Sequence, residues 1–247
     1  MSQKLWEPRL NGETAIEKLQ TEKGFDSYSS LHQWSINNLG EFWSRAWDDN
    51  QVIGTKGAVN FAQGADFISS KFFPEARLNV AENLLAHGDP SAIAIVSILE
   101  TGIRTEITWA ELRTKVAATA AAMRVEGVVA GDRVVAWVPN LTETIIYALG
   151  ALSIGAVVST ASPDFAPHAV EDRFGQVEPK ILLAADGYHY NGKYFDCTEK
   201  SQEIEKLLPT VKKTVRVSEF ASWIEPFIGT KAQYEKLPFE DRKSTRL

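Results

Sequence analysis

The sequence has very little cysteine: Cys197 is the only one among 247 residues. A single cysteine cannot form a disulfide within the chain, so a disulfide-stapled secreted scaffold is excluded and a reducing cytoplasm is the expected compartment. No neighbouring residues mark Cys197 as a nucleophile. We therefore expect a passive, partly buried thiol.

Long apolar runs and an excess of basic charge are also missing. The most apolar stretch, residues 145–158, is shorter than the ~20 residues that a membrane-spanning helix needs. Residues 1–10 contain no apolar core of a signal peptide. A formal net charge of −6 disfavours binding to nucleic-acid backbones or anionic lipid. We therefore expect small-molecule partners, with no nucleic acid and no membrane; the oligomeric state is not predicted.

Several sequence fingerprints of enzymes are absent. No G-x-G-x-x-G follows a predicted strand, which makes a Rossmann-type oxidoreductase a weak alternative. The four histidines have no metal-ligand spacing, and no G-x-S-x-G motif occurs. Residues 187–194 nearly match a P-loop, but Tyr194 stands where a Ser or Thr should bind Mg²⁺. On spacing alone, Lys193 is therefore expected to be a solvated lysine in a surface turn. The sequence predicts no catalytic residue and no metal ligand.

Aromatic residues are abundant in the N-terminal third. Trp34, Phe42, Trp43 and Trp47 recur at spacings typical of one face of a helix, which predicts an amphipathic helix within residues 30–47. Such an aromatic stripe is typical of packing against a neighbouring element. We expect residues 1–85 to form a helical, aromatic-rich N-terminal region.

From residue 91 onward, predicted strands alternate with predicted helices. The strands are expected at residues 92–99, 104–107, 133–138, 156–160, 180–185 and 214–217, and the helices at 109–125, 140–154, 167–177 and 201–208. Thr108 and Glu111 have the spacing of a capping box at the start of the first helix. This alternation predicts an α/β fold with a doubly wound, mostly parallel sheet. Such sheets bind ligands beyond the carboxyl ends of their strands, so the loops after Val138, Thr160 and Ala185 are the expected ligand-binding region.

Two blocks resemble a known superfamily. The segments 28–35, 41–43 and 73–85 are similar to the N-terminal extension shared by acetyl-CoA, propionyl-CoA and acetoacetyl-CoA synthetases. Residues 107–156 resemble the first α/β part of the adenylate-forming enzymes. The resemblance divides the chain into an extension (1–85), an incomplete first α/β part of the AMP-binding domain (86–239) and an atypical polar tail (240–247). It implies the N-terminal part of the adenylate-forming fold.

The segments 159–165, 172–174, 176–180 and 190–193 resemble the acetoacetyl-CoA synthetase branch. This implies an ATP-dependent ligase that activates acetoacetate as an acyl-adenylate and transfers it to CoA, releasing AMP and pyrophosphate. ATP, CoA and Mg²⁺ are the implied cofactors. In related ligases, the positions that match Ser162, Pro163, Asp164 and Phe165 border the CoA nucleotide. The basic residue that matches Lys193 meets its phosphates, and Tyr190 is expected to lie along the adenine.

The sequence also departs from this family. The Ser/Thr/Gly-rich phosphate loop, expected after residues 234–239, has no counterpart, and the acyl-pocket residues and the catalytic lysine of the C-terminal domain are absent as well. The resemblance therefore predicts a fragment that is inactive by itself and keeps part of a CoA site. Two alternatives stay open: an acetyl- or propionyl-CoA synthetase, and a short non-catalytic protein that binds CoA or a full-length ligase.

Overall fold

The computed structural model describes residue 12 and residues 14–239, which form two compact units. The first unit holds the described residues up to 52 together with 56–74, and the second holds 53–55 together with 75–239. The predicted polar tail, 240–247, lies outside the described residues. The predicted domain boundary at residue 85 stays a prediction.

The first unit consists of three helices and a short hairpin. Its elements are α1 (Ala15–Lys23), α2 (Tyr28–Asn37), α3 (Leu39–Asp49), β2 (Phe61–Ala62) and β3 (Lys71–Phe72). The expectation of one continuous helix within residues 30–47 is wrong, because Asn38 leaves helical geometry (φ −128°, ψ 51°) between α2 and α3.

Aromatic pairs hold the first unit together. Trp34 contacts Phe42 with ring centroids 6.2 Å apart, and Trp43 contacts Phe72 at 5.7 Å. Trp47 is buried and lies 5.0 Å from Phe73. Offset and edge-on ring contacts of this kind add to the stabilisation from apolar burial. The predicted packing role of the aromatic stripe is confirmed.

The second unit is built around a parallel sheet. Its strands are β7 (Arg133–Trp137), β8 (Val157–Ala161), β9 (Ile181–Ala184) and β12 (Lys213–Arg216), in the spatial order β12-β9-β7-β8. All three strand pairings are parallel. The helices of this unit are α4 (Val80–Ala86), α5 (Trp109–Val125), α6 (Thr142–Ser153), α7 (Pro167–Phe174), α8 (Thr198–Leu207) and α9 (Phe220–Ile224). Short 3-10 turns η1 (Gly175–Val177), η2 (Val217–Glu219) and η3 (Glu225–Phe227) follow α7, β12 and α9.

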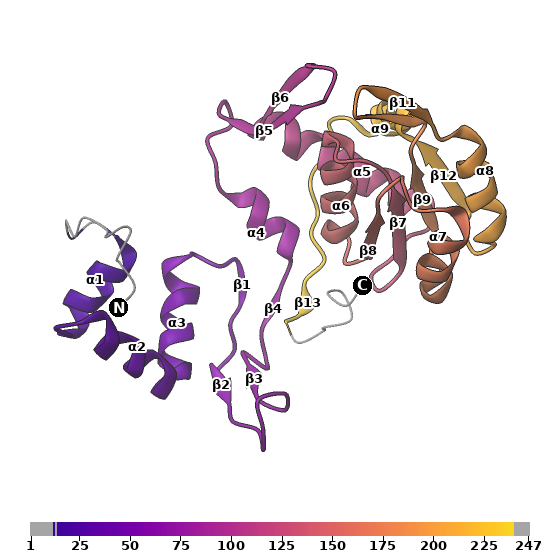
Figure 1. Cartoon of the computed structure of the whole chain (residues 1–247). Coiled ribbons are helices and arrows are strands. Elements are labelled where there is room, and N and C mark those ends of the chain that lie inside the picture. Colours follow the sequence, from indigo (N-terminus) through magenta and orange to yellow (C-terminus); the bar gives the residue numbers. More distant parts are fainter. Residues whose placement is uncertain (1–11, 13, 240–247) are drawn as a thin grey trace, which may run out of the picture. The chain divides into compact units, whose positions relative to one another are not determined.

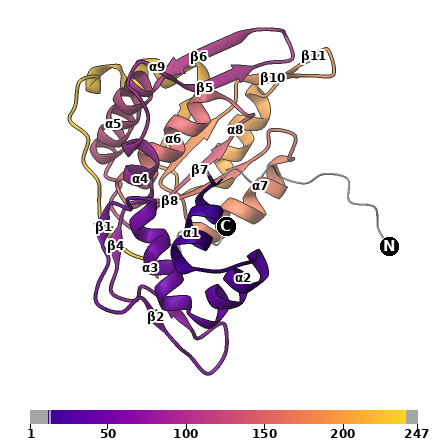
Figure 2. The ribbon, with the colours of Figure 1, turned by 90° about the vertical axis from the view of Figure 1, so that its left-hand side faces the viewer.

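Helices cover both faces of this sheet. Val134 and Ala136 of β7 pack into a core shared with α5, α6 and α9, whereas Val135 and Trp137 pack into a second core with α7 and α8. Figures 1 and 2 show α5 and α6 on one side of the sheet and α7 and α8 on the other. The alternation of side chains along β7 therefore produces three layers. The predicted doubly wound α/β architecture is confirmed.

The start of α5 follows the predicted local signal. The Thr108 hydroxyl accepts a hydrogen bond from the Glu111 backbone N–H at 3.2 Å, and the Glu111 carboxylate accepts one from the Thr108 backbone N–H at 2.7 Å. This reciprocal pair satisfies two N–H groups that a helix start leaves free. These backbone and hydroxyl hydrogen bonds lower the pKa of Glu111. The predicted capping box is confirmed.

Three small antiparallel elements complete the second unit. They are the hairpin of β5 (Ile93–Ile98) and β6 (Arg104–Thr108), the hairpin of β10 (Gly187–Tyr190) and β11 (Lys193–Asp196), and a sheet of β1 (Gly54–Thr55), β4 (Arg77–Leu78) and β13 (Leu237–Pro238). The two hairpins provide walls of the candidate site. The small sheet fixes residues 233–239 along the unit, and the Arg77 guanidinium supports it by donating to the Lys236 carbonyl at 2.5 Å.

Candidate functional site

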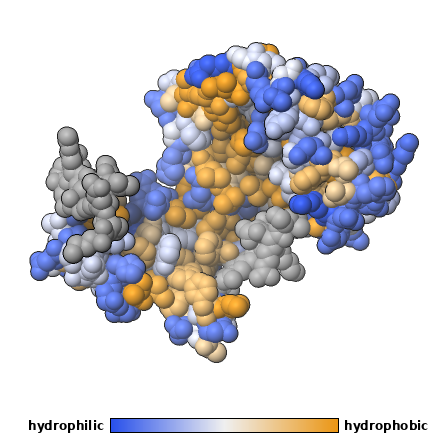
Figure 3. Space-filling model, viewed as in Figure 1, coloured by the Kyte–Doolittle hydropathy of each residue, from blue (hydrophilic) through white to orange (hydrophobic). Residues whose placement is uncertain are grey.

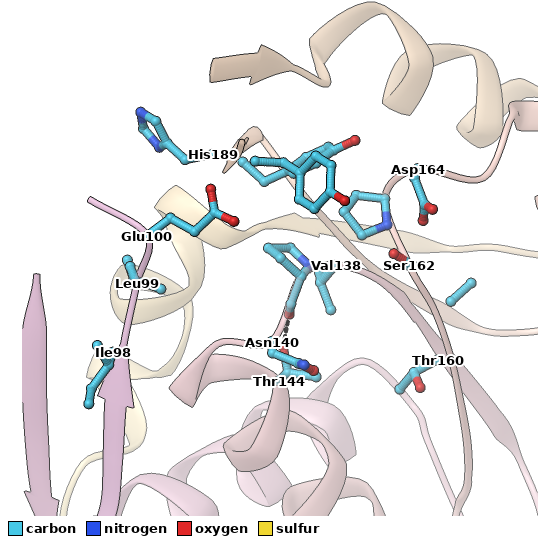
Figure 4. Close-up of a pocket in the computed structure, with 15 residues that line it drawn as sticks. Ile98, Leu99, Glu100, Val138, Asn140, Thr144, Thr160, Ser162, Asp164 and His189 are labelled. Carbon is cyan, nitrogen blue, oxygen red and sulfur yellow. Dashed lines mark hydrogen bonds between the residues drawn. The ribbon is translucent and has the colours of Figure 1, made fainter. Parts of the chain in front are cut away.

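A cavity of about 670 Å³ lies beyond the carboxyl ends of the parallel strands. Four segments line it: residues 98–100, 138–140 with Thr144, 160–164, and 188–190. The loops after Val138 and Thr160 and the chain after Ala185 were the predicted ligand-binding region, and these segments contain or adjoin them. Figure 4 shows their side chains converging on one space. Concave sites of this size are typical of small-molecule binding.

The floor of the cavity is held by hydrogen bonds between loops. The Val138 N–H donates to the Ala161 carbonyl at 3.1 Å, which ties the loop after β7 to the end of β8. The Thr144 hydroxyl donates to the Pro139 carbonyl at 3.0 Å, and this bond fixes the loop onto α6 (Figure 4). The loop is therefore set before any ligand arrives.

The loop after β8 carries the predicted residues 162–165. Ser162 and Asp164 are exposed, Pro163 is buried, and the Phe165 N–H donates to the Ser162 carbonyl at 3.2 Å, closing a tight turn. Phe165 turns away from the cavity and packs on the α7–α8 side of the sheet. Arg173 of α7 lies over the Phe165 ring, with its guanidinium carbon 4.5 Å from the ring centroid. This cation–π contact anchors the turn to α7.

Residues 187–196 form a hairpin, which rules out the P-loop reading of this segment. Asn191 and Gly192 both have positive φ (50° and 72°), as a two-residue primed turn requires. Tyr190 pairs with Lys193 across the turn, so the two predicted residues are neighbours. Tyr190 is 63% exposed and lines the cavity, whereas Lys193 is exposed and lies outside the lining.

Tyr188 gives the hairpin its fixed position beside the loop after β8. Its ring stacks on Phe195 with centroids 5.2 Å apart, and it packs against the core between the sheet and α7–α8. Burial raises the pKa of the Tyr188 phenol, and nearby negative charge, including that of Asp164, raises it further. The phenol therefore stays protonated near neutral pH and can donate a hydrogen bond toward the cavity.

The fourth wall comes from the β5–β6 turn and was not predicted as part of a site. The Gly102 N–H donates to the Leu99 carbonyl and the Leu99 N–H to the Ile103 carbonyl, both at 2.9 Å. Gly102 has φ +79°, which closes a three-residue loop that starts with Glu100. Ile98 is 67% exposed, and Figure 3 shows apolar side chains gathered over this hairpin. The hairpin was predicted from sequence, but no local signal relates it to loops 40–90 residues away.

The structure therefore brings four of the six predicted residues to one cavity. These are Ser162, Pro163, Asp164 and Tyr190. Phe165 and Lys193 lie next to it, through the turn at Ser162 and the pairing with Tyr190. The hairpin residues 98–100 were missed by sequence reasoning, and residues 138–140, Tyr188 and His189 lie in the predicted loop regions but were not singled out. Their role as ligand contacts is a matter for proposal.

Cys197 is buried in the core between the sheet and α7–α8. The thiol is 1% exposed, and burial raises its pKa, so at neutral pH it is an unreactive thiol.

Within residues 12 and 14–239, no group of three or more His, Cys, Asp or Glu side chains is arranged to hold a metal ion. In the same part of the chain, no helix combines the length and the apolarity needed to cross a bilayer.

Comparisons with known proteins show which proteins the chain resembles in sequence and in fold. The chain is 38% identical over 234 residues to the acetoacetyl-coenzyme A synthetase of Rhizobium meliloti (strain 1021), covering 88% of this chain and 35% of that protein. It is 41% identical over 192 residues to the acetoacetyl-CoA synthetase of Xenopus tropicalis, covering 76% of this chain and 29% of that protein. The solved acetoacetyl-CoA synthetase from Streptomyces lividans superposes with a TM-score of 0.86 at 30% identity, over 97% of this chain and 40% of that one.

The chain thus spans well under half the length of the relatives that it matches. Residues 85–244 match the sequence model of the family described as AMP-binding enzyme. That match covers more than half of the chain, including the parallel sheet and all four walls of the cavity. By its sequence and by the fold that surrounds this site, the chain belongs to the AMP-binding enzyme family.

Proposed function

We propose that this chain is part of an ATP-dependent acid–CoA ligase that acts on acetoacetate, and that its cavity is one wall of the CoA site. The observation that carries the proposal is the meeting of residues 162–164 and 190 on one cavity at the carboxyl ends of the strands. These were the positions expected to border the CoA nucleotide. The similarity to acetoacetyl-CoA synthetases supports acetoacetate as the acid.

The proposed reaction has two steps. A carboxylate oxygen of acetoacetate bonds to the α-phosphorus of ATP, and the bond to pyrophosphate breaks. The CoA thiol then gives up its proton and bonds to the acyl carbon of the adenylate, and AMP leaves. This chain would hold the CoA nucleotide during the second step, a positioning role that lowers the entropic barrier to attack.

The residues present fit part of CoA and not a metal. Tyr188 and Tyr190 offer flat aromatic surfaces of the kind that stack on a base. Lys193 lies on β11 and pairs with Tyr190 of β10, and its ammonium group would meet a phosphate as a point charge. Mg²⁺ is expected with ATP in this class of ligase. Because no described cluster of acidic or histidine side chains is arranged for a metal, we assign no residue to it.

The proposal extends to the organisation of the chain. We infer that residues 1–85 correspond to the N-terminal extension of short-acid CoA ligases and residues 86–239 to the first α/β part of the AMP-binding domain. The cytoplasm is the proposed compartment, since the lone cysteine is kept as a free thiol.

Calorimetry on the purified chain tests the CoA site. We expect CoA to bind, and we expect Lys193→Gln to weaken binding about fivefold to tenfold, the effect of losing one charge-assisted contact. Lys206→Gln is the matched control, because Lys206 is an exposed lysine on α8 that does not line the cavity. A chain that binds no CoA, or equal losses in the two variants, would refute the proposal.

The same protein, supplied with ATP, CoA and either acetoacetate, acetate or propionate, tests the reaction itself. We expect neither AMP nor acyl-CoA, because the resemblance implies a part of the ligase that is inactive by itself; AMP and acyl-CoA formed from acetoacetate would overturn that expectation. Co-purification of this chain with a full-length ligase would favour the alternative of a short non-catalytic protein that binds CoA or a full-length ligase.

A further inference from the structure

The charged side chains that line the cavity are all acidic. Glu100 and Asp164 are the two carboxylate side chains among the described lining residues, and neither Lys nor Arg belongs to that lining. Figure 4 shows the two carboxylates entering the cavity from opposite sides, Glu100 from the β5–β6 turn and Asp164 from the loop after β8. His189 lies above Glu100 in the same view, and its ring packs on Tyr194 with centroids 5.0 Å apart.

The cations near the cavity lie outside it. Arg173 is held over the Phe165 ring, one residue beyond Asp164 in the adjoining turn. Lys193 follows the hairpin turn and is exposed. The site therefore has an acidic interior with aromatic walls and basic residues outside.

This distribution of charge discriminates between the parts of a nucleotide. A phosphate group inside the cavity would face two carboxylates without a cation in the lining to offset them, and the like charges would repel. Carboxylates accept hydrogen bonds, so the interior suits a group that donates N–H or O–H. The faces of Tyr188 and Tyr190 suit a flat ring. An adenosine group has a flat base, an amino group and a hydroxyl, and matches these walls.

We propose that Glu100 is a recognition residue for the adenosine part of CoA: the acidic interior takes the base and sugar and keeps the phosphates outside, against Lys193 and Arg173. This inference rests on the proposed CoA site. Glu100 lies on a turn whose two backbone hydrogen bonds and left-handed Gly102 fix its position. It is exposed and belongs to the tip of a hairpin, so we expect its replacement to leave the fold intact.

Calorimetry with three probes tests the inference: CoA, adenosine 3′,5′-bisphosphate (its nucleotide half) and pantetheine 4′-phosphate (its other half). We expect Glu100→Gln to weaken CoA and the bisphosphate by the same factor, about fivefold to tenfold, since a charged acceptor becomes a neutral one. Pantetheine 4′-phosphate should bind both proteins equally. Glu203→Gln, an exposed site on α8, is the matched control and should change nothing.

The outcomes separate the two proposals. If the unaltered chain binds neither CoA nor the bisphosphate, the proposed CoA site is wrong and this inference fails with it. If CoA binds and Glu100→Gln binds it equally well or more tightly, the inference alone is overturned. Tighter binding would mean that a phosphate, rather than the base and sugar, occupies the acidic interior. A loss confined to pantetheine 4′-phosphate would also overturn it.

Discussion

Replacing Asn79 should destabilise the second unit more than its single side chain suggests. The side chain is 2% exposed, and its amide nitrogen donates to the carbonyls of Leu152 at 2.8 Å, Ser153 at 3.1 Å and Glu235 at 2.8 Å. Its carbonyl oxygen accepts from the Glu82 N–H at 3.1 Å and caps α4. One amide thus joins the start of α4, the end of α6 and the segment leading to β13.

The size of the effect follows from counting bonds. The amide has two N–H groups for three acceptors, so it makes two full bonds at a time. Each contributes about 1 kcal/mol net, and the N-cap contributes about 1 kcal/mol more. Asn79→Ala should therefore cost about 3 kcal/mol of unfolding free energy, and Asn79→Ser, which retains a cap, about 2 kcal/mol.

Urea unfolding measures the difference. With a slope of about 2–3 kcal/mol per molar, the Asn79→Ala midpoint should fall by about 1–1.5 M. Asn37→Ala is the control, because its side chain makes one exposed bond to Gln33 and should cost under about 0.5 kcal/mol. Amide exchange should also quicken at Glu235, whose N–H donates to the Ser153 carbonyl. If the urea midpoint of Asn79→Ala equalled that of Asn37→Ala, or if Asn79→Ser unfolded at the midpoint of the unaltered chain, the proposed contribution of the Asn79 amide bonds would be refuted.

Two further predictions concern packing and charge. A Cβ at Gly150 would lie 2.6 Å from the Thr119 methyl carbon, so Gly150→Ala should lower the free energy of unfolding in urea by about 1–3 kcal/mol. Adding Thr119→Ala should recover part of this loss. If the double variant recovered nothing, the close approach of α5 and α6 would be refuted. Burial opposes ionisation of Asp132, but the hydrogen bonds from the Lys180 ammonium at 2.6 Å and the Val129 N–H, together with the nearby positive charges, outweigh burial and lower the pKa. The stability it contributes should be present above the ordinary Asp pKa and be lost as pH falls through the lowered value. Asp132→Asn should therefore flatten the acid side of a stability–pH curve, and an unchanged curve would contradict this.

Local signals accounted for most of the second unit. The capping box at Thr108 fixed the start of α5, and the continuous apolar runs of β7 and β9 gave buried parallel strands, because both faces of the sheet are covered. In the first unit, the apolar spacing predicted one helix across Asn38, but α2 ends before this residue and α3 begins after it. Apolar spacing alone cannot detect such a break, since α2 and α3 continue the same stripe.

The hairpin at residues 187–196 was predicted only in part: a surface turn was expected there, but the two paired strands were not. Asn191-Gly192 is a strong local sign of a primed turn. The near-match to a P-loop, a motif that needs a helix after it, was rejected because Tyr194 replaces the Ser or Thr, and the strands on either side of the turn were not recognised. The chain enters β11 at Lys193, so the glycine serves a turn and not a phosphate cradle. The place of Glu100 beside the cavity and the contacts of Asn79 were beyond local reasoning, because they depend on segments far away along the chain.

The position of the cavity follows from the order of the strands. The chain runs from β7 to β8 on one side, then crosses back to β9 on the other side of β7. Its connecting helices accordingly leave in opposite directions: α6 packs into the core shared with α5, and α7 into the core shared with α8. The loops after β7 and β8 must therefore diverge, and a crevice is left at the carboxyl ends where the winding reverses. The sequence could predict this crevice from its alternating elements. Part of the charge inside it comes from the β5–β6 turn, which is why the replacement of Glu100 tests which part of CoA the crevice would hold, whereas CoA binding by the unaltered chain tests whether the crevice is a CoA site at all.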